Sequence, residues 1–231
     1  MKLYKNSVAL IPAYNEEKNI KEVIQRTKKS IENIIIVDDG SKDKTTEIAK
    51  REKAIVITHK INGGKGEAIR TGLDYILKKM PDIEYVVIID ADLQYLPEDS
   101  AKLISKLESE NLDFISGYRD SKQIPLANRL GNWGWRLVFN ILFSSNFKDT
   151  NCGIIAFNRK VMKVLKNGAF GGYIIDNAIR IDIVKNKFSY GDVLVQVSYG
   201  KRDVKKFAKM FFGNLLFIIK EGIKYRIGGK R

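Results

Sequence analysis

The sequence predicts an α/β fold in which a mostly parallel central sheet is flanked by helices. Short runs rich in β-branched and other apolar residues alternate with amphipathic segments of helical periodicity. The short runs are apolar at consecutive positions, as strands buried on both faces are, and this pattern favours a parallel sheet with helical crossovers. With 231 residues, 44% of them apolar, the chain has enough apolar material for one sizeable core.

Five strands are predicted in the first half of the chain, at residues 8–11, 34–37, 54–58, 85–89 and 114–116. Between the first two strands, one set of apolar residues recurs at helical spacing: Ile20, Val23, Ile24, Thr27 and Ile31. A less regular set lies between the third and fourth strands: Ala68, Leu73, Ile76 and Leu77. We also expect a helix near Lys44, one opened by residues 97–99, one over residues 126–143 and an amphipathic one over residues 207–219.

Residues 1–200 are expected to form one globular domain, followed by a basic amphipathic extension at residues 201–231. The apolar residues of the helix at 126–143 are explained better by packing in the core than by contact with a membrane interface. For the helix at 207–219, contact with a membrane or with a second copy of the chain is at least as favoured as packing into the core. The beginning of the chain has no apolar run of signal-peptide length, and the longest apolar stretches are shorter than the roughly 20 residues needed to span a bilayer.

The charge balance favours an anionic partner. Lys and Arg number 41 against 27 Asp and Glu, which gives a net charge of +14. Nucleic acid, a phosphorylated small molecule or an acidic membrane surface would all fit this charge. The single cysteine, Cys152, excludes an internal disulfide and favours a reducing, cytoplasmic setting, and with the single histidine, His59, it excludes most zinc sites. Neither residue is expected to be catalytic.

Each predicted strand is followed by a polar turn. Because the carboxyl ends of parallel strands lie on one edge of a sheet, where ligands bind, these turns are expected to form the functional site. Asp90, Asp92 and Gln94 follow the most apolar strand at alternate positions. If the extended conformation continues past Ile89, their oxygens face the same way and suit Mg²⁺ or Mn²⁺ bound partly through substrate phosphates. The alternative is that the two acids cap the next helix.

Two further turns carry candidate binding residues. One acid, Asp38, is enough to form the turn after the second strand, so the adjacent Asp39 is expected to have a second role. It is predicted to hydrogen-bond a base or ribose, as acidic residues after strands do in dinucleotide sites. Lys65 and Arg70 are predicted to hold a diphosphate at a helix N-terminus, although the glycine-rich stretch at residues 62–66 is equally well a simple connector.

Five motifs occur in a fixed order: Ile11-Pro-Ala-Tyr-Asn-Glu-Glu17, Val37-Asp-Asp-Gly-Ser-Lys-Asp43, Asn62-Gly-Gly-Lys-Gly66, Ile89-Asp-Ala-Asp-Leu-Gln94 and Asp149-Thr-Asn-Cys-Gly153. Together they resemble the family-two glycosyltransferases of the GT-A fold. Within that family the likeness is strongest to dolichol-phosphate mannose synthases and related polyprenyl-phosphate sugar transferases. The resemblance covers about residues 7–200.

The resemblance implies inverting transfer of a hexose from a nucleotide sugar, of the GDP-mannose or UDP-glucose type, to a polyprenyl (dolichyl) phosphate. It implies a Mg²⁺ or Mn²⁺ cofactor held by Asp90, Asp92 and Gln94. Four residues are implied to contact base and ribose: Pro12, Tyr14, Glu16 and Asp39. Lys65 and Arg70 are implied to lie near the diphosphate, and Arg119 and Arg129 are implied to face donor or acceptor phosphates.

The chain departs from the family pattern in two places. Related lipid-phosphate transferases usually carry Phe-x-x-Glu where this chain reads Tyr173-Ile-Ile-Asp-Asn177. Their basic segment after the last strand corresponds to Lys201-Arg-Asp-Val-Lys-Lys206, in which Arg202 is expected to serve a phosphate. The membrane-spanning helices that many members append are missing from this sequence, so we expect peripheral contact with the cytoplasmic face of a membrane. A homodimer through the C-terminal helix is a further expectation.

The identity of the acceptor decides whether a base is needed. A phosphate monoester has a second pKa near ~6, so a polyprenyl phosphate is already an anion at neutral pH. A hydroxyl acceptor needs a carboxylate to take its proton, and Asp176 is the first candidate, followed by Asp149. For both residues, helix capping is the competing role.

Two rivals belong to other classes. A basic nucleic-acid-binding protein would fit the charge, but the cations are dispersed and no recognised nucleic-acid motif is present, so no nucleic-acid partner is expected. A nucleotidyltransferase would open with a glycine-rich basic loop, which residues 12–16 do not provide.

Overall fold

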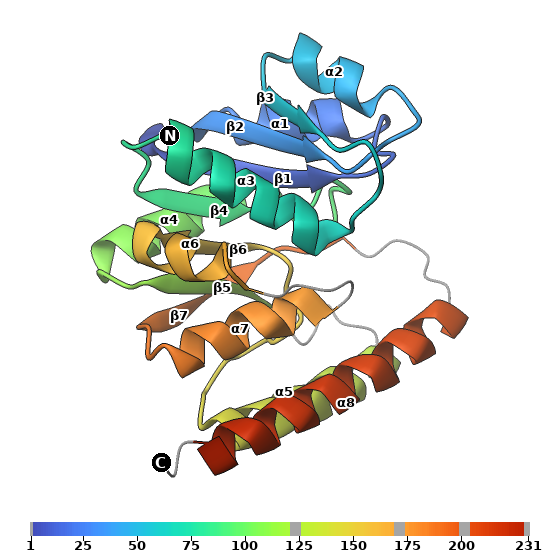
Figure 1. The fold of residues 1–231 in the computed structure, drawn as a ribbon, viewed down its shortest axis with the longest axis vertical. Helices are drawn as coiled ribbons and strands as arrows, with labels where there is room; N and C mark the ends of the chain where they lie inside the picture. The colour runs from blue at the N-terminus through green and yellow to red at the C-terminus, as the bar shows by residue number, and fades with distance from the viewer. Residues whose placement is uncertain (1, 121–125, 169–173, 199–203, 229–231) are drawn as a thin grey trace.

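A computed structural model describes residues 2–120, 126–168, 174–198 and 204–228, without the side chains of residues 126–128, 130 and 204–212. In this part of the chain, seven strands form one sheet in the order β3-β2-β1-β4-β6-β5-β7, with helices on both faces (Figure 1). The strands are β1 (Tyr4–Ala13), β2 (Ile31–Asp38), β3 (Ile55–Thr58), β4 (Tyr85–Ile88), β5 (Phe114–Arg119), β6 (Ile155–Asn158) and β7 (Tyr190–Val195).

The helices that accompany these strands are α1 (Ile20–Thr27), α2 (Thr45–Arg51), α3 (Lys65–Lys79), α4 (Asp99–Ser109), α5 (Leu126–Phe143), α6 (Arg159–Leu165), α7 (Ile175–Lys185) and α8 (Val204–Gly228). The predicted helices near Lys44, after residues 97–99 and over residues 126–143 are therefore confirmed. The C-terminal helix is longer than the predicted 207–219.

The predicted mostly parallel sheet is also confirmed. β1 pairs in parallel with both β2 and β4, β2 with β3, and β5 with β7. β6 and β7 are not among the five predicted strands, and β6 lies antiparallel between β4 and β5. The parallel strands direct their carboxyl ends, and hence the polar turns that follow them, to one edge of the sheet.

Alternation along β4 explains why its residues are apolar at consecutive positions. Val86 and Ile88 belong to a core shared with α3, α6 and α7, whereas Val87 and Ile89 belong to a second core shared with α1, α2 and α4. Both faces of the central strands are therefore covered by helices. The same alternation assigns the next residue, Asp90, to the side of the sheet covered by α3 and α7.

α5 and α8 lie side by side and form the part of the fold next to α7 (Figure 1). Their close approach requires Gly222, because a Cβ there would lie 2.7 Å from Cβ of Leu142. The rings of Phe143 and Tyr225 also pack together, with centroids 5.6 Å apart. Within the described ranges, no helix has both the length and the apolar composition needed to cross a lipid bilayer.

The contact between α3 and β1 gives a test of the packing. A Cβ on Gly72 would lie 2.2 Å from Cδ1 of the fully buried Leu10. We expect Gly72→Ala to lower the free energy of unfolding by about 1–2 kcal/mol, because overpacking outweighs the gain in helix propensity. Urea denaturation followed by circular dichroism measures this change. Gly134→Ala is the matched control, since a Cβ there has open space; equal stability of the two variants would contradict the expected tight contact.

Candidate functional site

The turns after β1 and β2 are held together by reciprocal hydrogen bonds. The backbone N–H of Asn15 donates to Oγ of Ser41 at 2.8 Å, and the N–H of Lys42 donates to Oδ1 of Asn15 at 2.9 Å. The N–H of Glu16 donates to Oγ1 of Thr45 at 2.8 Å. Asn15 adopts a left-handed conformation with φ 56°, which asparagine tolerates better than most residues. The two turns therefore form one rigid side of the site.

The two consecutive acids after β2 have separate structural tasks. Asp38 accepts a hydrogen bond from the N–H of Ser41 at 3.0 Å and another from the Thr46 hydroxyl, so it fixes its own turn and α2. Gly40 follows with φ +78°, as the predicted turn requires. Asp43, two residues before α2 begins, accepts a hydrogen bond from the N–H of Thr45 at 3.0 Å and so ties the turn to the first residue of the helix.

Asp39 holds the glycine-rich loop that precedes α3. Its carboxylate is only 3% exposed and accepts hydrogen bonds from the N–H groups of Gly63 at 2.9 Å and Gly64 at 2.6 Å. Nδ1 of His59 lies 2.7 Å from the same carboxylate, and Nε2 lies 2.9 Å from Oγ1 of Thr71. His59 thus links the loop to α3, a supporting role that sequence reasoning missed. The assignment of Asp39 to a base or ribose stays a prediction.

Lys65 is the first residue of α3 and forms the centre of a charged cluster. Its Nζ lies 2.6 Å from Oδ1 of Asp90 and 3.7 Å from Oδ1 of Asp176, the second residue of α7. Asp90 lies two residues beyond β4, and the other two side chains come from the N-termini of two helices on the same face of the sheet. The structure therefore brings together three of the residues predicted from sequence.

Acids outnumber cations in this cluster. Burial lowers the pKa of the Lys65 ammonium, but Asp176 and Asp90 outweigh this effect and raise it, so Lys65 is charged at neutral pH. Burial raises the pKa of Asp90 despite the opposing effect of Lys65. Burial also raises the pKa of Glu16, and the charge of Asp92 adds to the rise. Such a concentration of negative charge favours a bound cation.

The chain does not remain extended after β4. Residues 91–94 form a turn, Leu93 has φ 57°, and the N–H of Gln94 donates to Oδ1 of Asp92 at 2.9 Å. The expectation that Asp90, Asp92 and Gln94 face the same way along an extended strand is therefore wrong. The alternative role as helix caps also fails, because α4 begins only at Asp99.

The carboxylates of this turn still fit a hard divalent cation. In the described ranges, no three His, Cys, Asp or Glu side chains form a group able to hold a metal. Mg²⁺ typically takes only one or two protein carboxylates and completes its coordination with phosphates and water. Asp90 and Asp92 are carboxylates of this kind, and their assignment to a metal ion stays a prediction.

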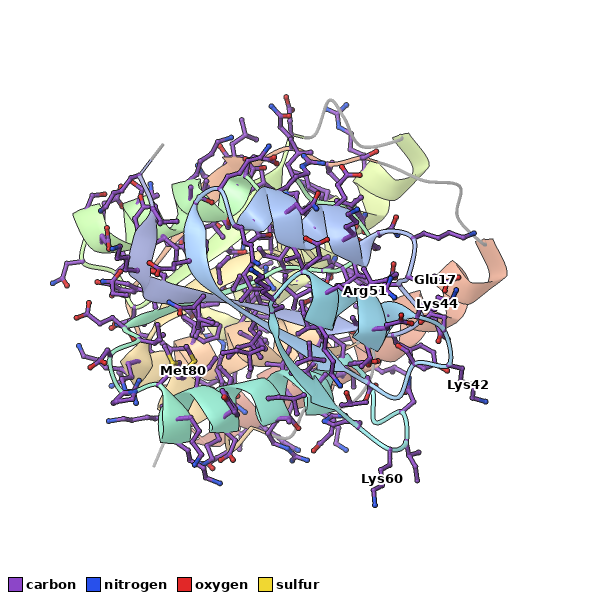
Figure 2. All side chains as sticks on the ribbon, turned by 90° about the horizontal axis from the view of Figure 1, so that it is seen from above. Glu17, Lys42, Lys44, Arg51, Lys60 and Met80 are labelled. Atoms are coloured by element: carbon purple, nitrogen blue, oxygen red, sulfur yellow. The ribbon has the colours of Figure 1, made fainter. Side chains whose placement is uncertain are left out.

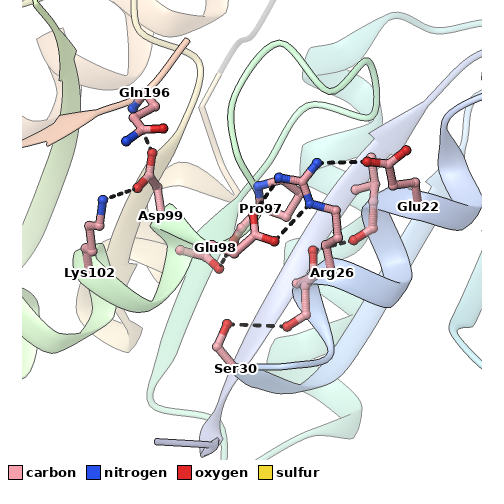
Figure 3. Close-up of polar contacts among 11 residues, drawn as sticks. Glu22, Arg26, Ser30, Pro97, Glu98, Asp99, Lys102 and Gln196 are labelled. Atoms are coloured by element: carbon pink, nitrogen blue, oxygen red, sulfur yellow. Dashed lines mark hydrogen bonds and ion pairs between the residues drawn. The ribbon is translucent and has the colours of Figure 1, made fainter. Parts of the chain in front are cut away.

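The loop after β4 is held from both sides (Figure 3). Arg26 of α1 makes two bonds to the Glu98 carboxylate, at 2.9 and 2.7 Å, and a third to Glu22 at 2.8 Å. The buried Asp99 accepts from the N–H of Gln196, just beyond β7, at 2.8 Å. The end of this loop, where α4 begins, is therefore tied to α1 and to the chain just beyond β7.

Gly153 allows the Asp90 carboxylate to approach the backbone before β6. A Cβ at this position would lie 2.4 Å from Oδ2 of Asp90. The N–H of Gly153 donates to the hydroxyl of the buried Tyr95 at 3.2 Å, which ties the same backbone to the loop after β4. Any larger residue at 153 would displace Asp90.

Arg119 and Asp149 form a buried ion pair behind the site. The guanidinium donates to both carboxylate oxygens, at 2.7 and 3.0 Å. Burial raises the pKa of Asp149, but Arg119 outweighs it and the net shift is downward. A carboxylate held in this way is a weak base, which disfavours Asp149 as the proton acceptor. Arg119 itself faces Asp149 in this structure and not an open phosphate site.

Arg180 of α7 is a site-supporting residue that sequence reasoning missed. It is fully buried and donates to Oγ of Ser116 at 2.6 Å, to the carbonyl of Cys152 at 2.9 Å and to the carbonyl of Asp176 at 2.7 Å. The only sequence signal is an arginine between two isoleucines in an apolar helix. As expected, Cys152 is not suited to act as a nucleophile, because burial raises its pKa to about 12.

The remaining predicted residues are more dispersed. Pro12 is buried at the end of β1, and Tyr14 is exposed beyond it. Arg70 pairs with Glu67 on the exposed side of α3, and Arg129 is exposed on α5. Arg202 lies outside the described residues.

Exposed lysines lie on two of the loops at this end of the molecule. Lys42 and Lys44 follow β2, and Lys60 follows β3, and all three project outward from the loops (Figure 2). The positive charge of these lysines suits an anionic ligand such as a phosphate compound.

Comparison with known proteins identifies the family. The model of "Glycosyl transferase family 2" matches residues 8–170. An uncharacterized protein of Methanocaldococcus jannaschii is 34% identical over 204 residues, which cover 83% of this chain and 88% of that protein. The UDP-N-acetylglucosamine–dolichyl-phosphate N-acetylglucosaminyltransferase of Methanococcus voltae is 32% identical over 232 residues, covering 90% and 92% of the two chains.

A solved structure shares the fold. Glucosyl-3-phosphoglycerate synthase from Mycobacterium tuberculosis, in complex with Mn²⁺, UDP-glucose and phosphoglyceric acid, superposes with a TM-score of 0.74 at 19% identity. The match covers 94% of this chain and 79% of the synthase chain, and confirms the predicted GT-A architecture. From the family match and the identity to these relatives, we conclude that the chain is a glycosyltransferase and belongs to glycosyl transferase family 2.

Proposed function

We propose that this enzyme transfers a hexose, with inversion, from a UDP or GDP sugar to a polyprenyl (dolichyl) phosphate. The observation that carries the proposal is the acidic cluster around Lys65 at the carboxyl edge of the sheet, where Asp90 and Asp176 converge. The named activity of the Methanococcus voltae relative, which uses dolichyl phosphate, supports the acceptor class. The proposed setting is the cytoplasmic face of a membrane, and the buried free thiol of Cys152 fits a reducing compartment.

Asp90 and Asp92, with Gln94, are the residues that would hold Mg²⁺ or Mn²⁺. When bound, the ion would offset the charge that develops on the departing nucleoside diphosphate. The Mn²⁺ and UDP-glucose complex of the mycobacterial synthase supports a divalent cation as the cofactor, without identifying the residues that hold it.

The remaining groups of the chain have the following proposed roles. Lys65 presents a fixed positive charge to the diphosphate, and Arg70 and Arg202 contribute further positive charge. The exposed ring of Tyr14 packs against the base, next to Pro12 and the half-buried Glu16. Asp39 acts through the loop that it holds, and it contacts the ribose if that loop opens toward the ligand. Arg129 faces the acceptor phosphate.

A hydroxyl acceptor is the second candidate, because Asp176 is available as a base. Its carboxylate is half-buried and 3.7 Å from the Lys65 ammonium, whereas Asp149 is fully engaged by Arg119. A phosphate acceptor attacks as an anion and needs no such base.

The reaction itself can be tested with a panel of donors. With Mn²⁺ or Mg²⁺ and short-chain polyprenyl phosphate, we expect one member of a panel of UDP and GDP sugars to give a glycosyl phosphate lipid with inverted anomeric configuration. Mass spectrometry detects the product and NMR assigns the anomer. If the sugar is transferred only to hydroxyl groups of sugars, the second candidate function is the correct one. If no donor gives any product, both candidate functions are refuted.

Asp92→Asn tests the metal assignment. We expect kcat/KM to fall by about 10²-fold or more, because a charge that stabilises the leaving group is lost. Calorimetric binding of Mn²⁺ with UDP or GDP should weaken in parallel. Asp82→Asn, at an exposed position before β4, is the matched control and should behave like the wild type. Full activity of Asp92→Asn would remove this residue from the metal site.

Asp176→Asn distinguishes the two acceptor classes. Transfer to a phosphate acceptor should fall by less than about 10-fold, since no proton has to be removed, whereas transfer to a hydroxyl should fall by about 10²–10⁴-fold. Initial rates with each acceptor measure the difference. Asp182→Asn, on the same helix, is the control. An equally severe loss with a phosphate acceptor would show that Asp176 has another essential role.

A further inference from the structure

α5 exposes a row of large apolar side chains. Trp133, Leu137 and Ile141 follow one another at intervals of four residues, so they lie on one side of the helix. The opposite side is buried in the core through Trp135, Phe139 and Phe143. The exposed row is therefore turned away from the rest of the protein and is not explained by core packing.

α8 exposes a second row of the same kind. It comprises Leu216, Ile219, Ile223 and Ile227, at intervals of three and four residues. This row extends over roughly 16 Å of helix, at about 1.5 Å per residue. The buried Ile218 lies on the other side of α8, toward α5 and the core.

The two rows lie on adjacent helices. Gly222 contacts Leu142, and the Arg226 guanidinium donates to the carbonyls of Ile141 and Leu142 at the end of α5. On both helices the exposed rows lie on the side away from the core, so together they form one surface. We call this surface the α5–α8 face and define it by its seven apolar residues, which are between 37% and 69% exposed.

A surface of this kind needs an occupant. Monomeric soluble proteins seldom expose so many large apolar side chains together, and such patches mark interaction sites. The charge beside the α5–α8 face indicates which kind. The α8 sequence contains six lysines and arginines and one glutamate, and the described Lys220 and Lys224 are exposed next to the apolar row. Apolar residues flanked by cations fit an interface of acyl chains and anionic headgroups.

Pairing with a second copy fits the charge less well. A symmetric contact through the same helices would bring Lys220, Lys224 and Arg226 of both copies together, and like charges facing each other disfavour association.

We propose that the α5–α8 face docks the enzyme on an anionic lipid bilayer, with its seven apolar side chains inserted at the headgroup boundary. The proposal rests on the proposed function, because it states how a protein whose acceptor is a lipid phosphate reaches that acceptor. The bilayer is contacted by α5 and α8, whereas the donor binds at the carboxyl edge of the sheet.

The test uses the full chain and sedimentation with vesicles of phosphatidylcholine, with and without phosphatidylglycerol. We expect the wild type to bind the anionic vesicles, more weakly as salt is raised, and to bind neutral vesicles poorly. The double variant Ile141→Glu/Leu216→Glu should bind at least tenfold more weakly. Leu3→Glu is the matched control, because Leu3 is exposed outside the α5–α8 face, and it should bind like the wild type.

Tryptophan fluorescence gives a second readout. Trp133 is 54% exposed, so its emission should shift to shorter wavelength when the wild type meets anionic vesicles. The shift should disappear in Trp133→Phe, which retains the buried Trp135. Matching circular dichroism spectra and melting curves establish that the charged variants are folded.

The outcomes separate docking from catalysis. Equal vesicle binding by the wild type and the double variant overturns the docking proposal, and so does a wild-type dimer that the double variant converts to a monomer. Transfer to water-soluble short-chain polyprenyl phosphate should survive in the double variant. If the wild type transfers sugar to this acceptor but does not bind vesicles, the docking proposal is refuted and the proposed function stands. If the wild type binds vesicles and the double variant does not, docking is supported even when no phosphate acceptor reacts.

Discussion

The placement of Asp90 at the end of a buried strand is the constraint on which the site depends. A carboxylate in this position costs several kcal/mol unless a cation or donors compensate it. Lys65 supplies the compensation within the protein, at 2.6 Å, and links β4 to the start of α3. Because Asp176 and Asp92 add negative charge around the same ammonium, the compensation is incomplete, and this makes the site receptive to a further cation.

The surrounding loops are rigid for reasons that can be stated residue by residue. Asp38 fixes its own turn, Asp39 fixes the glycine loop before α3, and Arg26 and Asp99 hold the junction between the loop after β4 and α4. The buried Arg119 and Arg180 support the backbone behind it. Such a scaffold holds the few groups that face the ligand in fixed positions. This preorganisation is the main source of electrostatic catalysis. The α5–α8 face lies apart from this edge, so the lipid surface and the nucleotide would be handled by different elements.

Some predictions followed directly from local sequence patterns. The strands, the α5 boundaries and the start of α3 depend on periodicity and turn chemistry, which are local properties. β6 was missed because a strand of four residues, of which three are apolar, carries no signal of direction or sheet position. The shape of the acidic turn was also missed. A strand pattern indicates neither the left-handed backbone of Leu93 nor the hydrogen bond that the N–H of Gln94 donates to the Asp92 carboxylate.

The sequence by itself determined the alternating architecture, the polar edge and the family of this protein, since these depend on residue types at short spacings. Only the tertiary structure decided which charges meet. Asp90 and Asp176 are far apart in sequence, yet both meet Lys65 because α3 and α7 cover the same face of the sheet. Arg119 was assigned to a phosphate from sequence, but the fold buries it against Asp149, because a buried guanidinium is stabilised by a carboxylate that accepts from two of its N–H groups.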